Sequence, residues 1–99
     1  MSLEKLLASS KEVKDESFIY FEISKNYDVS INKISAGTKV DEHTHEQEVF
    51  NYVFYGEAKF SLSGKSLKLG KGDWVRIEKE VSHSLEVVDD TCLLEFWKR

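Results

Sequence analysis

From residue 18 onward the chain contains short strand-like runs of apolar residues, and in residues 27–31 apolar and polar residues alternate with the period of two that is typical of β-strands. Strand-like runs cover residues 18–23, 27–31, 49–55, 57–62, 66–69, 73–77, 84–88 and 91–97. Their links are short and contain Gly, Asn, Asp or Ser, the residues that form tight turns. Many short strands joined in this way predict an all-β domain, built as an antiparallel sandwich or barrel.

The N-terminal segment has a different pattern. Leu3, Leu6 and Leu7 have helical spacing, which predicts one or two turns of amphipathic helix that must pack against the rest of the protein. Residues 11–17 are mostly charged, and we expect them to form a connector.

One predicted strand carries aromatic residues on a single face. Phe50, Tyr52 and Phe54 alternate with smaller residues, of which Asn51 is the polar one. Such a bulky face usually packs against a sheet or a partner chain, so we interpret it first as a packing surface.

Composition and charge restrict the class of protein. Ninety-nine residues with 40% hydrophobic and 32% charged content fit one compact domain. The formal charge of -4 repels a phosphate backbone, so we expect no binding of nucleic acid. No apolar run approaches the length of about 20 residues that a membrane-spanning helix needs, and residues 1–17 lack the apolar stretch of a secretory signal. We therefore expect a cytoplasmic protein without a membrane partner, in which the single cysteine, Cys92, is a small buried side chain.

The three histidines are the most informative residues. His43 and His45 are two positions apart, so in an extended segment both side chains point to the same face. His83 follows after several strands, and a closed barrel would bring it opposite the pair and complete three nitrogen ligands for a metal. Spacing alone leaves a second interpretation open, because the acidic residues around this pair are also typical of a solvated loop.

Two sequence motifs around these histidines resemble those of the cupin superfamily. The segment 37–45, GTKVDEHTH, resembles the first motif, which ends at a glycine that corresponds to Gly56 in YVFYGE. The segment from Gly72 to His83, beginning GDWVRI, resembles the second motif with its spacing intact. The resemblance covers roughly residues 27–97 and implies an antiparallel double-stranded β-helix, the cupin jelly-roll barrel. It also places His43, His45 and His83 at the metal-ligand positions of the family.

The sequence departs from the first motif at the fourth ligand. The acidic or glutamine ligand of the family corresponds to Val49, and Glu48 is adjacent to it. A regular strand would give a three-histidine site with Asn51 on the inner face, where it is a candidate for substrate binding. A β-bulge would instead turn Glu48 inward as a fourth ligand. We favour the three-histidine site and keep Glu48 as the candidate fourth ligand, or as a candidate catalytic base if it does not bind the metal.

The second motif also departs from the family pattern. Glu78, Glu80 and Ser82 replace two prolines and a glycine, so the backbone before His83 is less constrained. Because Glu80 stands where the family has glycine, we expect a loop that does not need a positive φ angle there.

The resemblance implies a domain division and a set of functions. Residues 1–26 would be an N-terminal extension with a short helix and strand that contacts a partner in a homodimer, and residues 27–99 would be the barrel. The expected function is that of a small metal-binding cupin with Fe, Mn, Ni or Zn, an enzyme such as a dioxygenase or isomerase acting on a small organic acid or sugar-like molecule. The alternatives are a non-catalytic module that binds a ligand or regulates a partner, and a barrel whose histidines only form hydrogen bonds. We expect Phe18 and Tyr20, together with the aromatic face of residues 49–55, to cover apolar surface in the homodimer.

Overall fold

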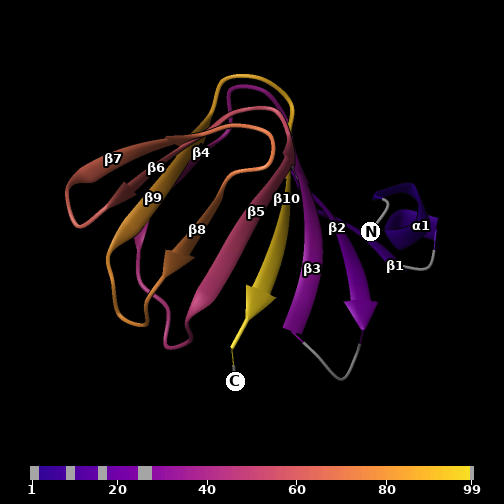
Figure 1. Cartoon of the computed structure of the whole chain (residues 1–99), viewed down its shortest axis with the longest axis horizontal. Coiled ribbons are helices and arrows are strands. Elements are labelled where there is room, and N and C mark those ends of the chain that lie inside the picture. The colour runs from indigo at the N-terminus through magenta and orange to yellow at the C-terminus, as the bar shows by residue number, and fades with distance from the viewer. Residues whose placement is uncertain (1–2, 9–10, 16–17, 25–27, 99) are drawn as a thin grey trace.

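A computed structural model of the chain describes residues 3–8, 11–15, 18–24 and 28–98, and nearly all of its regular structure is β-strand (Figure 1). The elements, in chain order, are α1 (Leu3–Ala8), β1 (Lys11–Asp15), β2 (Phe18–Ser24), β3 (Asp28–Ile34), β4 (Lys39–His43), β5 (Val49–Tyr55), β6 (Ala58–Leu62), β7 (Lys65–Leu69), β8 (Trp74–Ile77), β9 (His83–Val87) and β10 (Thr91–Trp97).

The strands form two antiparallel sheets. The larger sheet has the order β1-β2-β3-β10-β5-β8, and the smaller has the order β4-β9-β6-β7. In Figure 1 the smaller sheet lies to the left and the larger one extends to the right, with α1 beside its far edge. The predicted all-β antiparallel barrel is therefore confirmed.

The N-terminal segment differs in one respect from the prediction. Residues 3–8 form the expected helix, and Leu3 and Leu7 pack against the outer face of the larger sheet. The predicted connector at residues 11–17 is wrong, because Lys11–Asp15 form strand β1, which pairs with β2. A strand at the edge of a sheet is held by backbone hydrogen bonds, so charged side chains do not prevent it from forming and even discourage pairing with another chain.

The main core fills the space between the two sheets. It consists of buried side chains that project from both inner faces: Ile34, Val49, Val53, Ala58, Phe60, Val75, Ile77, Val87 and Leu93. Along β5, burial alternates strictly from Val49 to Val53, which is the signature of a regular strand with one face in the core. This regularity determines which face of the sheet each side chain of β5 occupies.

A second cluster lies on the outer face of the larger sheet. Ile31, Cys92 and Leu94 are buried there, and Tyr52 and Phe54 pack against them, as expected for the aromatic face. The Cys92 thiol is fully buried, and this burial raises its pKa to about 11, so it is the unreactive packing residue that we expected. The side chains of Phe18 and Tyr20 lie outside the part of the chain that is described.

Two turns show how backbone geometry determines residue choice. Gly56 has φ +87°, and a Cβ atom there would lie 2.4 Å from Oγ1 of Thr91, so only glycine fits. Glu80 has φ 63°, which contradicts the expectation that this loop needs no positive φ. The N–H of Glu80 donates a 2.8 Å hydrogen bond to the carbonyl of His45, and this bond helps to hold the unusual conformation.

Within the described residues, no helix is both long enough and apolar enough to cross a lipid bilayer.

Candidate metal centre

The three histidines lie together between the two sheets, at one end of the barrel. His43 is the last residue of β4 and His83 the first of β9, and these two residues are direct partners across the antiparallel pair. His45 follows in the loop that leads into β5. The possible ligand atoms of the three side chains all lie within 4.8 Å of one another. The structure thus brings together residues that are far apart in the sequence.

Backbone carbonyl groups orient two of the rings. Nδ1 of His43 lies 2.7 Å from the carbonyl oxygen of Asp41, and Nδ1 of His83 lies 2.9 Å from that of Val81. A carbonyl can only accept, so each Nδ1 carries the proton and each Nε2 is left as the acceptor or ligand atom. This arrangement is typical of metal-binding histidines, whose second nitrogen donates to a backbone carbonyl or a carboxylate.

The spacing of the nitrogen atoms can be compared with the size of a metal ion. Nε2 of His43 lies 2.9 Å from Nε2 of His45. Bonds of about 2.1 Å to one ion place two adjacent imidazole nitrogens about 3.0 Å apart at a right angle and about 3.4 Å apart at a tetrahedral angle. The observed separation is close to the shorter value, so His43 and His45 have the spacing of two ligands to one divalent transition metal.

The electrostatic surroundings favour the neutral form of two of the rings, those of His45 and His83. Burial lowers the pKa of His45, and the nearby His43 and His83 lower it further. Burial also lowers the pKa of His83, with His43 contributing in the same direction, while the hydrogen bond to Val81 opposes the shift. Metal binding requires neutral imidazole, so this site is prepared to bind a cation near neutral pH.

Trp97 forms one wall of the site. Its ring meets that of His45 edge to face, with centroids 4.8 Å apart and an angle of 88° between the planes. Trp97 packs against the main core, so it lies on the inner face of β10. It shields one side of the histidine cluster and limits the access of water there.

Glu48 is not brought to the histidines. Its carboxylate forms an ion pair with Nε of Arg76, and Nζ of Lys98 lies 3.9 Å from its second oxygen. Because β5 is regular from Val49, Glu48 has the parity of the opposite face. It does not belong to the group of described residues that could hold a metal together.

Asn51 lies where the regular strand was expected to place it. It is only 4% exposed, and its direct partners are Glu95 on β10 and Val75 on β8. Val75 belongs to the main core, so Asn51 faces the barrel interior beside it.

Two interior polar residues were not predicted from the sequence. Glu95 on β10 and Asn32 on β3 both occupy inward positions, and burial raises the pKa of the Glu95 carboxyl to about 7. The signal was present for Glu95, because it has the same parity as Leu93 and Trp97 in an otherwise apolar strand. Asn32 gave no comparable signal, since its neighbours of the same parity are polar Ser30 and apolar Ile34.

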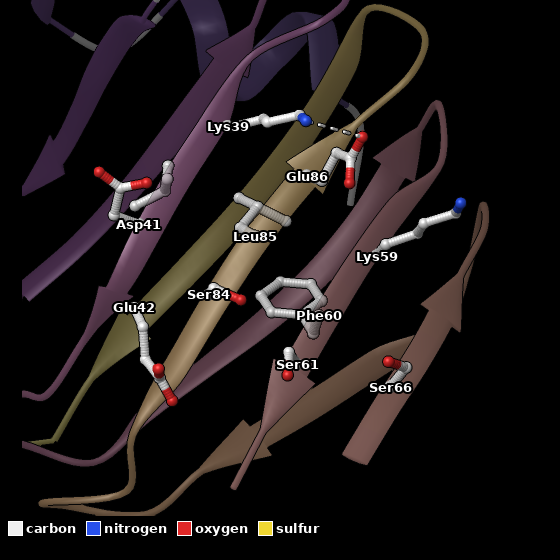
Figure 2. Close-up of a pocket in the computed structure, with 11 residues that line it drawn as sticks. Lys39, Asp41, Glu42, Lys59, Phe60, Ser61, Ser66, Ser84, Leu85 and Glu86 are labelled. Atoms are coloured by element: carbon white, nitrogen blue, oxygen red, sulfur yellow. Dashed lines mark ion pairs between the residues drawn. The ribbon is translucent and has the colours of Figure 1, made fainter. Parts of the chain in front are cut away.

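A shallow hollow of about 330 Å³ lies over the outer face of the smaller sheet, away from the histidines (Figure 2). Lys39 and Glu86 form a 3.9 Å ion pair beside it, and Lys59, Asp41 and Glu42 add charges of both signs. Mixed, largely exposed charges of this kind are typical of a solvated sheet face.

Comparison with known proteins gives a consistent family assignment. The sequence model of the cupin domain matches residues 30–96. No curated protein matches the chain in sequence. The structure of KdgF from Halomonas sp. is similar, with a TM-score of 0.79 and 19% identity over 90% of this chain and 86% of that one. An RmlC-like cupin from Shewanella frigidimarina NCIMB 400 is similar with a TM-score of 0.82 and 16% identity over 91% of this chain and 84% of that one.

A third similar structure belongs to a much longer protein. The salicylate 1,2-dioxygenase of Pseudoaminobacter salicylatoxidans, in a structure of its adducts with gentisate, has a TM-score of 0.67 and 25% identity over 70% of this chain. The match covers only 19% of the dioxygenase chain. The match to the cupin domain extends over most of the sequence, and the two sheets have the expected architecture. The chain therefore belongs to the cupin family.

Proposed function

We propose that this protein is a metal-dependent cupin enzyme that acts on a small organic acid or sugar-like molecule. His43, His45 and His83 would hold one divalent transition metal, with Fe, Mn, Ni and Zn as the candidates. The observation that carries the proposal is the convergence of three imidazoles whose ligand atoms lie within 4.8 Å of one another. The backbone carbonyls that fix two of the rings add to it.

Three neutral ligands leave the charge of a bound cation uncompensated. Such a cation retains open coordination positions, and it supplies Lewis-acid activation of an anionic substrate, of water or of O2. An organic acid is therefore a well-matched substrate class, because its carboxylate is drawn to the positive centre. Imidazole accepts most first-row metals, and a structural neighbour that is named a dioxygenase favours iron among them.

The chain's own residues would bind and orient the substrate. Asn51 projects from β5 into the barrel beside Val75 and offers both a donor and an acceptor. Trp97 covers His45 and excludes water from that side. Glu48 is engaged by Arg76 and Lys98 on the other face, so we assign it a structural role rather than that of a ligand or catalytic base.

One observation favours a second candidate function. No carboxylate joins the histidines in the described part of the chain, and a cupin without its acidic ligand could bind a small molecule without converting it. This alternative is a non-catalytic ligand-binding or regulatory module.

Metal analysis of protein purified without a His tag tests the proposal. We expect close to one equivalent of Fe, Mn, Ni or Zn per chain, and loss of that metal in the His43→Ala and His83→Ala variants. Protein that contains no metal and takes up none on incubation with each of the four ions would refute the metal site. Consumption of O2 or isomerisation of small hydroxy and keto acids by the metal-loaded protein distinguishes the enzyme from the binding module.

We also propose that the protein is a cytoplasmic homodimer without nucleic-acid or membrane partners. Phe50, Trp74 and Phe96 form an apolar surface on the larger sheet, where Trp74 is 62% and Phe96 is 44% exposed. Exposed aromatic residues at this density are typical of protein interfaces, and residues 1–26 would contribute further contacts. Light scattering at micromolar concentration should give twice the mass of the chain, and the mass of a single chain would count against the dimer.

A further inference from the structure

Polar side chains are placed on the inner face of the larger sheet, along the strand that carries Trp97 to the candidate metal centre. Glu95 on β10 is the direct partner of Asn51 on β5 and of Ser30 on β3. Asn32 lies two residues further along β3, diagonal to Glu95. These positions lie on the same face as Leu93, a residue of the main core, so the group lies inside the barrel.

Asn32 has unused hydrogen-bonding capacity. The residue is 1% exposed, and neither Nδ2 nor Oδ1 of its side chain has a hydrogen-bond partner among the residues that the structure describes. Buried amide groups are almost always paired, because an unpaired one loses its bonds to water without replacement. An unpaired interior amide therefore indicates a position at which something other than the protein satisfies the donor and the acceptor.

The carboxyl of Glu95 also has unused hydrogen-bonding capacity. It has the same parity as Trp97, whose ring contacts His45, and two residues along a strand span about 7 Å, so Glu95 is one step deeper than the histidines. No ion pair or hydrogen bond to its carboxyl is found among the described residues, although the side chain is partly accessible. Its raised pKa, which burial causes, is in keeping with a carboxyl that lacks a compensating positive charge.

The chemistry of the group defines the molecule that it fits. Amide and carboxyl groups together supply several donors and several acceptors within one small region, which is the pattern that hydroxyl groups complement. A second carboxylate would be repelled by an ionised Glu95, so the anionic end of a ligand belongs at the metal end of the barrel. A purely apolar acid would leave these polar groups unpaired and would be rejected.

We propose that Glu95, Asn51 and Asn32 form a hydroxyl-binding subsite beside the histidines, which selects hydroxylated carboxylic acids over acids with apolar bodies. This inference rests on the proposed function, because it assigns the carboxylate of the substrate to the metal end and the hydroxyl groups to the subsite. It narrows the substrate class from small organic acids in general to sugar acids and related polyhydroxy acids.

Two six-carbon acids provide matched probes. D-gluconate and hexanoate have the same chain length and the same carboxylate, and they differ in hydroxyl groups. Binding to the metal-loaded protein is measured by calorimetry, and the side-chain amide signals of Asn32 and Asn51 are followed by NMR, with the variants Asn32→Leu and Asn51→Leu providing their assignment. We expect gluconate to bind at least about tenfold more tightly than hexanoate and to shift both amide signals.

Single-residue variants distinguish an effect on ligand binding from an effect on the stability of the fold. Replacing the unpaired amide by an apolar group of similar size should raise the melting temperature of Asn32→Leu by roughly 5 °C while weakening gluconate binding by about tenfold or more. Asn51→Leu and Glu95→Gln should also weaken the binding of gluconate and leave the binding of hexanoate unchanged. Ser84→Ala, on the outer face of β9, is the control and should change the binding of neither acid.

Equal binding of the two acids, or undisturbed amide signals in the presence of gluconate, would overturn the subsite. If the protein still binds metal when the subsite is refuted in this way, the proposed function is not contradicted. The reverse result is distinguishable, because a preference for gluconate with shifted amide signals in protein that takes up no metal would support the subsite and refute the metal centre.

Discussion

The Glu95→Gln substitution provides a quantitative test of the barrel interior. Burial raises the pKa of this carboxyl from its ordinary value of 4.5 to about 7. Glutamine has nearly the same shape but never ionises, so it removes the cost of an interior negative charge and keeps most of the packing. We expect the variant to be more stable than the parent protein at alkaline pH and similar to it at acidic pH.

The sign and size of this difference in stability follow from the linkage between folding and proton binding. Between pH 4.5 and 7 the unfolded chain has released the proton of Glu95, while the folded protein still holds it. The contribution of Glu95 to stability is therefore full below pH 4.5 and is lost as the pH rises through 7. Each pKa unit corresponds to about 1.4 kcal/mol, so the loss reaches about 3 kcal/mol at pH 8 and only about 1 kcal/mol at pH 5.

Urea unfolding of the parent and the variant, followed by tryptophan fluorescence at several values of pH from 5 to 8, measures this difference. Contributions from the other titrating groups cancel in the comparison of the two proteins. Glu12→Gln, at an exposed position of β1, is the matched control and should show no pH-dependent difference from the parent. A Glu95→Gln advantage that is the same at pH 5 and pH 8 would refute the assignment of Glu95 to a desolvated interior position.

Three further predictions address the turns, the outer ion pair and the metal centre. Gly56→Ala should destabilise the protein by about 3 kcal/mol, because its Cβ would lie 2.4 Å from Oγ1 of Thr91 at φ +87°, whereas Gly64→Ala, at φ +83° with open space around it, should cost only about 1–2 kcal/mol in urea unfolding. Glu48→Gln should leave the metal content by elemental analysis unchanged, and loss of metal would show that Glu48 is a ligand after all. Zn²⁺ at a hundredfold excess over its Kd should stabilise the fold by about 3 kcal/mol at neutral pH. Because the pKa values of His45 and His83 are lowered, this gain in stability should persist at pH 6.5. It should decline at lower pH, where protons compete with Zn²⁺ for the imidazoles. A gain that instead rises with acidity would contradict neutral imidazole ligands.

Much of the fold was predictable because its determinants are local. The period of two in β5 specifies which residues share a face, and the structure keeps this alternation from Val49 to Val53. Strand β1 was missed because an edge strand is held by backbone hydrogen bonds to its neighbour, and side-chain pattern does not report on those bonds. The positive φ of Glu80 was missed for a related reason, since a long-range hydrogen bond to the carbonyl of His45 overrides the local preference.

The candidate site was predictable only in part. The convergence of the histidines was expected from the resemblance to the cupin motifs, whereas spacing alone left it open. The position of Asn51 followed from the parity of a regular strand. The placement of Glu95 opposite Asn51 depends on β10 lying between β3 and β5, a strand order that spacing along the chain does not reveal. Similarly, the burial of Asn32 arises from the sheets that surround it and is invisible in its sequence neighbours.

The central position of β10 also bears on how the protein forms during translation. β3 and β5 pair with β10 on its two sides, yet the ribosome makes β10 after both of them. Until β10 has left the exit tunnel, β3 and β5 each lack a neighbouring strand, and unpaired edges of this kind favour aggregation. Arrival of this one strand joins β3 and β5 and delivers Trp97 to the histidines, so the site and the sheet are completed in the same event.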